Sequence, residues 1–536
     1  HRRVNDNVVR ATVLRMLRQF QHGIEILVGH RDDNAGLAIA LFNGNLEIAL
    51  PLFKAHREEL ALLARNEQAL DIQVIDPVAD IRTQAGLIER QVIVERIQRG
   101  RPDAAHVFAR VILRVELRVF GGHRRNILII GFMSTYPDLH LYIDGEWRKT
   151  ADDLPVLNPA TEEEIGRLPH AAKNDLDDAL AAADRGFQAW RQVAPMERAN
   201  VLYRAASLMR ERQEEIATAI TAEHGKPLDQ ARLEVIRGCE FFEWDAGEAT
   251  RTYGRVIPSA PGVRYIVHHQ PIGTVAAFSP WNFPMSQPCR KVAGAIAAGC
   301  SIILKASEET PAGALSIARA LHDAGLPPGV LNLVFGSPAE ISSHLIRDDQ
   351  VRLVAFTGST VVGRHLTTLA AQHMTPVLME LGGHAPVIVC EDTDVQAAAL
   401  TGAVRKMRNA GQVCTSPTRF FVHESIFDAY TETFVKRAAA TVVGNGVDPK
   451  VEMGPLANDR RVDALTTMVE DACAKGAELR TGGSRLGDVG YFFQPTVLAN
   501  VPDDADVMQE EPFGPLAVIN PVASLDEAIE KANSVP

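Results

Sequence analysis

Apolar strands alternate with single helices through the middle of this 536-residue chain, and that order restricts the folds it can adopt. The runs 300–305, 330–336 and 351–357 are typical of buried strands, and 311–324 is typical of a helix that ends at a glycine. Buried strands joined by helices favour a parallel sheet that is covered on both faces. We therefore predict an α/β fold, with a second unit of the same kind from about residue 385 to the end.

The segment before these strands has a different pattern. Apolar residues recur at helical spacing over 175–190 and 196–223, which predicts amphipathic helices. Between 264 and 277 the pattern becomes typical of β-strands.

The first 132 residues differ in composition from the rest of the chain. They contain no Ser, Cys, Tyr or Trp, and Lys54 is their only lysine. Serine is common in ordinary domains, so its absence over this length is atypical of a coding segment. We interpret Met133 as the natural start and 1–132 as a non-native leader; a genuine extra helical domain is the alternative. At the other end the helical pattern is still in progress at Pro536, so we expect a truncated chain.

Charge and cysteine content exclude several classes of function. The formal net charge is −12, and no basic stripe is long enough to follow a phosphate backbone, so nucleic acid is not an expected partner. Six scattered cysteines do not form a disulfide scaffold, which favours a reducing cytoplasm. No apolar run is long enough to span a bilayer, so we predict a soluble, cytoplasmic protein with no membrane partner.

Two strand ends carry residues suited to a dinucleotide. The strand that ends near 357 runs into Gly358 and Ser359, where free N–H groups at a helix start would face a pyrophosphate. An ordinary Ser/Thr helix cap is the alternative. An earlier strand ends at Lys305, followed by Ser307 and Glu308, and ligands of open α/β sheets bind at such carboxyl ends. Lys305 would donate to ribose hydroxyls and Glu308 would accept from them, or the two form an ordinary charge pair.

Three further residues suit covalent chemistry on a carbonyl. Cys414 lies in a polar turn, and a thiolate whose pKa is lowered by a backbone N–H at a helix start is a good nucleophile. Glu380 ends an apolar run before two glycines, which suits a base for water. Asn282 lies between Trp281 and Phe283, where a fixed amide could donate to an oxyanion. The other five cysteines are interpreted as structural: Cys239, Cys289, Cys300, Cys390 and Cys473.

Taken together, these motifs resemble the aldehyde dehydrogenase superfamily from Met133 to Pro536. The resemblance rests on 281–284, 305–308, 356–359, 380–383, 411–414 and 510–515. It implies a Rossmann-type NAD-binding domain (133–254 and 273–384), a β-hairpin oligomerisation arm (255–272) and an α/β catalytic domain (385–536). The arm's C-terminal strand is expected to be missing, and the full-length protein is expected to be a homodimer or homotetramer.

The resemblance also implies a role for each residue. Cys414 would attack the aldehyde, with the oxyanion held by Asn282 and by the Cys414 backbone N–H. Glu380 would activate the water that hydrolyses the resulting thioester. Glu511 would hold the nicotinamide ribose and Phe513 would lie against the ring. The expected cofactor contacts are Trp281, Lys305, Ser307, Glu308, Gly358, Ser359, Leu381, Glu511 and Phe513. No metal site is expected.

Within the superfamily, the likeness is to succinate-semialdehyde and 2-oxoglutarate-semialdehyde dehydrogenases. Two arginines hold the far carboxylate there, and Arg290 and Arg408 match them here; a solvated helix face or an internal ion pair is the alternative. Glu308 would repel a 2′-phosphate, so NAD is expected over NADP. Ser416 stands where some relatives carry a second cysteine, so no redox switch is expected. Succinate semialdehyde is the favoured substrate, with 2-oxoglutarate and glutarate semialdehydes as alternatives.

Two rival functions share these motifs. A CoA-acylating dehydrogenase would use the same nucleophile, but that subgroup generally lacks the glutamate base, so Glu380 favours hydrolysis. A truncated, non-catalytic relative is the other alternative.

Overall fold

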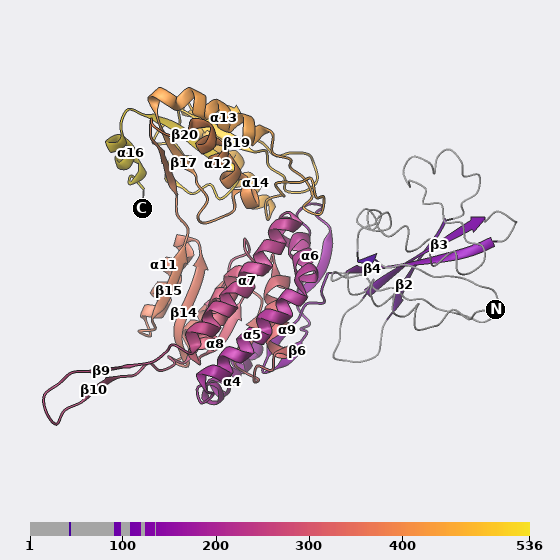
Figure 1. Cartoon of the computed structure of the whole chain (residues 1–536), viewed down its shortest axis with the longest axis vertical. Coiled ribbons are helices and arrows are strands. Elements are labelled where there is room, and N and C mark those ends of the chain that lie inside the picture. Colours follow the sequence, from indigo (N-terminus) through magenta and orange to yellow (C-terminus); the bar gives the residue numbers. More distant parts are fainter. Residues whose placement is uncertain (1–41, 44–89, 98–107, 119–123, 135, 536) are drawn as a thin grey trace, which may run out of the picture. The chain divides into compact units, whose positions relative to one another are not determined.

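The computed structural model describes residues 42–43, 90–97, 108–118, 124–134 and 136–535 (Figure 1). The chain divides into two compact units, His1–Asp138 and Leu139–Pro536. The described part of the first unit is a sheet with strand order β1-β4-β3-β2, formed by β1 (Phe42–Asn43), β2 (Arg90–Ile97), β3 (Phe108–Arg118) and β4 (Arg124–Ser134). Most of the predicted leader (1–132) lies outside the described residues, so its origin stays a prediction.

The second unit contains the predicted parallel sheet. Its strand order is β15 (Val377–Leu381), β14 (Val351–Gly358), β11 (Thr274–Phe278), β12 (Ser301–Lys305), β13 (Leu331–Val334), β5 (Leu141–Ile143) and β6 (Glu146–Arg148). The strands from β15 to β13 pair in parallel, whereas β5 pairs antiparallel with β13 and with β6. β12 and β13 are buried along their whole length, as their apolar runs predicted.

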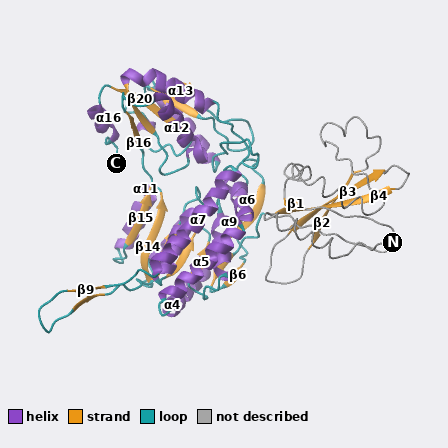
Figure 2. Ribbon diagram, in the orientation of Figure 1, coloured by secondary structure: helices purple, strands orange, loops and turns teal. Residues whose placement is uncertain are grey.

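Each crossover in this sheet is a helix. The crossovers are α8 (Ser286–Ala298), α9 (Pro311–Asp323), α10 (Pro338–Ile346) and α11 (Thr360–Ala371). A group of longer helices precedes them, namely α4 (Lys173–Trp190), α5 (Pro195–Glu211), α6 (Gln213–His224) and α7 (Leu228–Ala249). α5 packs against α7, and α7 packs against α8 (Figure 2). Because these crossovers join parallel strands, the strands from β11 to β15 all end at the same edge of the sheet. Ligands of such sheets bind at that edge.

A thin hairpin projects from this part of the chain (Figure 1). Its strands, β9 (Arg255–Ile257) and β10 (Tyr265–Val267), pair antiparallel and lie within the predicted 255–272 arm. Apolar side chains on it are exposed, with Val256 at 71% and Tyr265 at 59%. Another short antiparallel pair is formed by β7 (Asp153–Leu157) and β8 (Glu164–Pro169).

Another parallel sheet begins with β16 at Pro386, in the unit that was predicted from about residue 385. Its order is β16 (Pro386–Val389), β17 (Arg419–His423), β20 (Leu516–Val522), β19 (Thr496–Ala499) and β18 (Glu478–Thr481), and only β18 is antiparallel to its neighbour. Its helices are α12 (Val395–Met407), η1 (Arg408–Gly411), η2 (Glu424–Ile426), α13 (Phe427–Ala439), α14 (Asp459–Ala474), α15 (Asp506–Gln509) and α16 (Leu525–Ala532). The predicted α/β architecture is confirmed. Among the described residues, no helix is both long and apolar enough to cross a bilayer.

Candidate active site

The parallel sheet that contains β11 to β15 reverses its strand order between β11 and β14. The chain moves from β11 to β12 and β13 on one side, whereas β14 and β15 lie on the other side of β11. In open α/β sheets, ligands bind outside the carboxyl ends of the strands at such a reversal, which is called a switch point. Trp281 and Asn282 follow β11, and Gly358 closes β14. The topology therefore brings two of the predicted motifs to one switch point.

Asn282 links this switch point to the segment that carries the cysteine. Its side chain is buried, and Nδ2 donates to the backbone carbonyl of Gln412 at 3.0 Å. Asn409 Nδ2 lies 3.2 Å from that same carbonyl and 3.2 Å from the carbonyl of Asn282. Because Gln412 lies two positions before Cys414, these bonds fix the amide beside the turn that holds the thiol.

The turn before Cys414 has an unusual backbone. Asn409 and Ala410 both have φ of 53°, and Gly411 follows at 68°. A Cβ on Gly411 would lie 2.0 Å from the carbonyl oxygen of Gly514, so only glycine allows this approach. Runs of left-handed residues are strained in L-amino acids and persist only where the surroundings determine them. The backbone therefore places Cys414 through contacts rather than through local preference.

Cys414 is partly buried and lies near two carboxylates. Burial raises the pKa of its thiol, and the charges of Glu511 and Glu380 raise it further. Hydrogen bonds from the backbone N–H groups of Cys414 and Thr415 act in the opposite direction. The prediction of a lowered thiol pKa was wrong for the free protein: Cys414 lies in a turn between η1 and β17, where desolvation and the two carboxylates outweigh the N–H groups.

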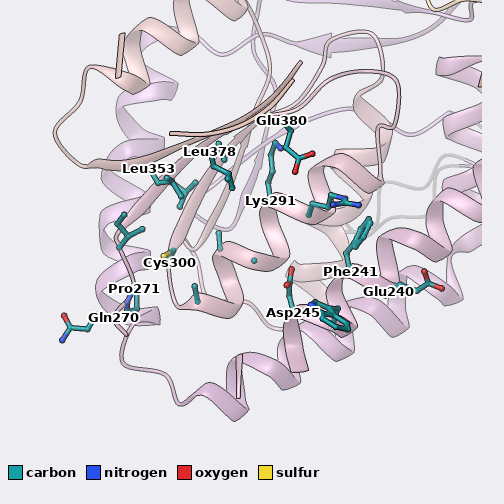
Figure 3. Close-up of a pocket in the computed structure, with 18 residues that line it drawn as sticks. Glu240, Phe241, Asp245, Gln270, Pro271, Lys291, Cys300, Leu353, Leu378 and Glu380 are labelled. Atoms are coloured by element: carbon teal, nitrogen blue, oxygen red, sulfur yellow. The ribbon is translucent and has the colours of Figure 1, made fainter. Parts of the chain in front are cut away.

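Glu380 lies on β15, opposite Thr357 of β14, and its side chain is accessible. The Lys291 side chain runs toward it (Figure 3). Lys291 Nζ donates to Thr357 Oγ1 at 2.5 Å, and burial lowers the pKa of Lys291 to about 8 while Glu380 opposes that shift. An accessible carboxylate at this position can accept a proton from water.

Glu380 and Lys291 also line a cavity of about 780 Å³, whose walls come from α7, α8 and the strands β11, β14 and β15 (Figure 3). Arg290 lines the same cavity, with its guanidinium carbon 4.3 Å from the centre of the Phe241 ring. Burial raises the pKa of Asp245 in its wall to about 6, and Arg290 opposes this. The structure therefore places one of the two predicted arginines in the wall of the cavity that Glu380 also lines.

Arg408 has a different position. It begins η1, its side chain is exposed, and it is absent from the lining of that cavity. Its charge contributes to lowering the pKa of the buried Lys226. The side chain is thus close to the Asn282 network, on the segment that leads to Cys414.

Lys305 and Glu308, which were predicted to contact a ribose, form the charge pair that was the alternative interpretation. Lys305 Nζ lies 2.5 Å from a Glu308 carboxylate oxygen, and Lys305 is almost fully buried. Ser307 Oγ accepts from the backbone N–H of Glu309 at 3.3 Å. A Lys–Glu pair at a strand end still offers both a donor and an acceptor to a diol. The charge pair is therefore compatible with the predicted binding of a ribose.

The predicted pyrophosphate residues lie at the start of α11. Ser359 Oγ caps this helix by accepting from Val362 N at 3.4 Å, so its side chain acts as the ordinary cap. Gly358 lies at the end of β14, and the exposed Leu381 packs against Gly363 of α11. The unpaired N–H groups of a helix start remain suited to an anion.

Aromatic rings lie close to Trp281, and a further carboxylate, Glu511, lies close to Gly383. The rings of Trp281 and Phe513 pack edge to face with their centres 5.5 Å apart. The centre of the His224 ring lies 6.0 Å from that of the Trp281 ring. Burial raises the pKa of Glu511 to about 7, while the charge of Lys406 and a bond from the Gly383 N–H lower it. The set of ring, carboxylate and helix start suits a nicotinamide dinucleotide. In the described part of the chain, no group of three or more His, Cys, Asp or Glu side chains could hold a metal ion.

Several residues of the site were missed by sequence reasoning: Lys226, Glu234, Lys291, Lys406 and Asn409. Lys226 and Lys406 are buried charged residues, and a lysine beside Gly225 or on an otherwise apolar helix face could have signalled them. Asn409 lies two positions before the cysteine motif 411–414, but only its left-handed conformation reveals its function in the turn.

The fold is α/β, and Asn282, which follows β11 of its parallel sheet, contacts the segment that carries Cys414. A model described as the aldehyde dehydrogenase family matches residues 147–536, and the chain belongs to that family. It is therefore an oxidoreductase, and the predicted family is confirmed.

Relatives of known sequence and structure agree with this assignment. The chain is 47% identical over 409 residues to the 4-(hydroxymethyl)benzenesulfonate dehydrogenase TsaD1 of Comamonas testosteroni, covering 75% of this chain and 85% of that protein. It is 41% identical over 372 residues to a succinate-semialdehyde dehydrogenase of Paenarthrobacter nicotinovorans, covering 69% and 83%. The crystal structure of a succinate-semialdehyde dehydrogenase from Burkholderia pseudomallei matches with a TM-score of 0.72 and 40% identity, covering 74% and 83%. Solved relatives also include an NAD⁺ complex and an enzyme named as NADP dependent, so the family match leaves both cofactors open.

Proposed function

We propose that this enzyme oxidises an aldehyde that carries an anionic group at its far end, with succinate semialdehyde as the favoured substrate. The observation that carries the proposal is the hydrogen bond from Asn282 Nδ2 to the Gln412 carbonyl, two positions before Cys414. The charge of Glu380 raises the pKa of the Cys414 thiol, so this carboxylate is also close to the sulfur. In this proposal Asn282 is the oxyanion donor, Cys414 the nucleophile and Glu380 the base. Two of the relatives above are named for substrates with a carboxylate or sulfonate.

In the proposed mechanism, the Cys414 thiolate attacks the aldehyde carbon and forms a thiohemiacetal. The amide of Asn282 has two N–H groups, and only one is used by Gln412, so the other can donate to the developing oxyanion. NAD, when bound, would supply the acceptor for the hydride of the thiohemiacetal carbon, whose loss leaves a thioester on Cys414. Glu380 then takes a proton from the water that attacks the thioester, which releases the acid and restores Cys414.

The chain's residues would hold the dinucleotide at the switch point of the sheet. The N–H groups at the start of α11 would face the pyrophosphate, Lys305 and Glu308 the adenosine ribose, and Glu511 the nicotinamide ribose. Trp281 and Phe513 would enclose the nicotinamide side. We propose NAD rather than NADP, because the Glu308 carboxylate would repel a 2′-phosphate. A kcat/KM ratio in favour of NADP, measured with one aldehyde, would overturn this choice.

Arg290 is the stronger candidate for binding the anionic end of the substrate. It lies in the same cavity as Glu380, and its contact with Phe241 orients the guanidinium. Arg408 is proposed to assist from the segment before Cys414, where its side chain is accessible. Guanidinium groups bind carboxylates and sulfonates through paired hydrogen bonds.

A second candidate substrate class is favoured by the aromatic wall of the cavity. Phe241 and Trp244 both line it, and the 47% identical relative is named for a benzenesulfonate. An aromatic aldehyde with an anionic ring substituent would pack on these rings while Arg290 binds its charge. Glutarate and 2-oxoglutarate semialdehydes are the aliphatic alternatives.

The test is NADH formation from the purified full chain. Succinate, glutarate and 2-oxoglutarate semialdehydes and 4-formylbenzenesulfonate are compared by kcat/KM, with butanal as the uncharged control. We expect activity with at least one anionic aldehyde and its loss in Cys414→Ala. A Cys414→Ala variant that still makes NADH at the wild-type rate would disprove the mechanism, and a preference for butanal would disprove the substrate class.

Assembly and location are proposals of the same kind. The exposed apolar hairpin supports assembly into a homodimer or homotetramer, because projecting strands with free edges pair readily with another chain. A reducing cytoplasm is proposed because Cys414 must remain a free thiol for the reaction.

A further inference from the structure

A buried ion pair lies behind the Asn282 turn. Lys226, between α6 and α7, places Nζ 2.6 Å from a carboxylate oxygen of Glu234 on α7. Both side chains are almost completely buried, at 1% and 2% exposure. Burying two charges requires that every remaining donor and acceptor find a partner, so the other contacts of this pair are informative.

Those contacts converge on one segment. Lys226 Nζ donates to the backbone carbonyl of Asn282 at 2.9 Å and lies 4.3 Å from the centre of the Phe283 ring. The second oxygen of Glu234 accepts from the backbone N–H groups of Met285 at 2.8 Å and Ser286 at 3.1 Å. The ion pair therefore fixes the turn that runs from Asn282, the proposed oxyanion donor, to Ser286 at the start of α8.

The same carbonyl is shared with the cysteine segment. Asn409 Nδ2 lies 3.2 Å from the Asn282 carbonyl, next to the ammonium of Lys226. Asn282 Nδ2 in turn donates to Gln412. A displacement of Lys226 would thus change the distance between the amide of Asn282 and the thiol of Cys414.

We propose that Lys226 and Glu234 are positioning residues for the oxyanion donor, which hold the Asn282 amide at the distance from Cys414 that acylation requires. This inference rests on the proposed function, in which Cys414 is the nucleophile. A buried ion pair adds little net stability compared with apolar residues of the same volume. Its contacts with the Asn282 carbonyl and with two N–H groups instead determine where that turn lies.

Two reactions of the same thiol separate positioning from folding. With p-nitrophenyl acetate, the Cys414 sulfur bonds to the carbonyl carbon through an oxyanion, and p-nitrophenolate leaves with the bonding electrons. With iodoacetamide, the sulfur displaces iodide at a saturated carbon and no oxyanion forms. The ratio of the two rates therefore reports the oxyanion donor at constant thiol reactivity, and neither reaction requires the dinucleotide.

The variants are Lys226→Met and the double variant Lys226→Met/Glu234→Gln. The glutamine can still accept from Met285 and Ser286, and the double variant leaves no unpaired buried charge, so it tests the inference even if the single variant folds poorly. Val235→Ala is the matched control, because Val235 is a fully buried neighbour of Glu234 on α7 with no part in the network.

We expect both Lys226 variants to lower the acylation-to-alkylation ratio by roughly 10–100-fold, as loss of oxyanion alignment does. Val235→Ala should leave the ratio unchanged. Asn282→Ala should lower it similarly, and adding Lys226→Met to Asn282→Ala should have little further effect, because both act through one amide.

The outcomes separate a failure of the positioning inference from a failure of the proposed function. If Cys414→Ala is still acylated at the wild-type rate, the proposed function fails. If acylation requires Cys414 but the double Lys226/Glu234 variant keeps the wild-type ratio, the positioning inference fails alone. Equal losses of both rates, or full additivity with Asn282→Ala, would also reject positioning and leave only a general structural role.

Discussion

The closest backbone approach near the thiol offers a sharp test of the site. Gly411 has φ of 68°, and an added Cβ would lie 2.0 Å from the carbonyl oxygen of Gly514 and 2.9 Å from the nitrogen of Pro515. Carbon atoms prefer separations of about 3.5–4.0 Å from non-bonded neighbours, so Gly411→Ala must push the two segments apart by more than ~1 Å. Cys414 lies three positions further along and should move with the turn.

The size of the effect follows from that displacement. A misplacement of about 1 Å can lower the rate of an enzyme by ~100-fold. A left-handed alanine is strained by about 1–2 kcal/mol, and overpacking typically destabilises by about 1–3 kcal/mol. We therefore expect Gly411→Ala to lower kcat by about two orders of magnitude and the free energy of unfolding by a few kcal/mol.

The assay is NADH formation, with unfolding by urea measured in parallel. Gly487→Ala is the control, because Gly487 has φ of 79° but a Cβ there would contact nothing within 4 Å. It tests left-handed strain without the collision and should keep nearly full kcat. Wild-type kcat in Gly411→Ala would refute the argument that this approach positions the thiol, and so would an equal loss in Gly487→Ala.

Three further predictions address individual groups. Glu380→Gln should give one NADH per active site and then turn over ~10²–10⁴-fold more slowly, because general-base catalysis is lost; sustained rapid turnover in stopped-flow measurements would contradict this. Arg290→Gln should raise KM for succinate semialdehyde by ~10-fold or more through loss of a charged hydrogen bond, while butanal is unaffected; equal changes would exclude its binding role. Glu511→Gln should shift the pH profile of Cys414 alkylation to lower pH, because the negative charge of Glu511 raises the thiol pKa; an unchanged profile would contradict this.

The sheet was predictable because its strands are buried on both faces. The run 300–305 corresponds to β12 (Ser301–Lys305), and 311–324 to α9 (Pro311–Asp323), which is one residue shorter. A strand inside a covered sheet must be apolar throughout, so its pattern identifies it without long-range information. The short pair β5–β6 was missed, because three-residue strands carry too little periodicity.

The site was predictable only where a motif contains its chemical groups. Cys414, Glu380 and Asn282 each carry a reactive or donor group within a distinctive run of residues. Lys226 and Glu234 do not, because their function depends on contacts with Asn282, which lies 56 positions after Lys226. The raised thiol pKa was unpredictable for the same reason, since it arises from burial and from carboxylates distant in the sequence.

Strain and buried hydrogen bonds are combined around the thiol. Asn409, Ala410 and Phe513 all have positive φ, at 53°, 53° and 43°, and none of them is glycine. Such residues are each strained by about 1–3 kcal/mol and need contacts that oppose relaxation. The side chain of Asn409 is fixed by two carbonyls, and the carbonyls of Pro512 and Phe513 accept from Arg461. The two strained turns meet where Gly411 contacts Gly514, so relaxation of either turn would be resisted by the bonds that hold the other. The position of Cys414 is therefore set jointly by both turns, and a change in either should alter the reaction before it unfolds the protein.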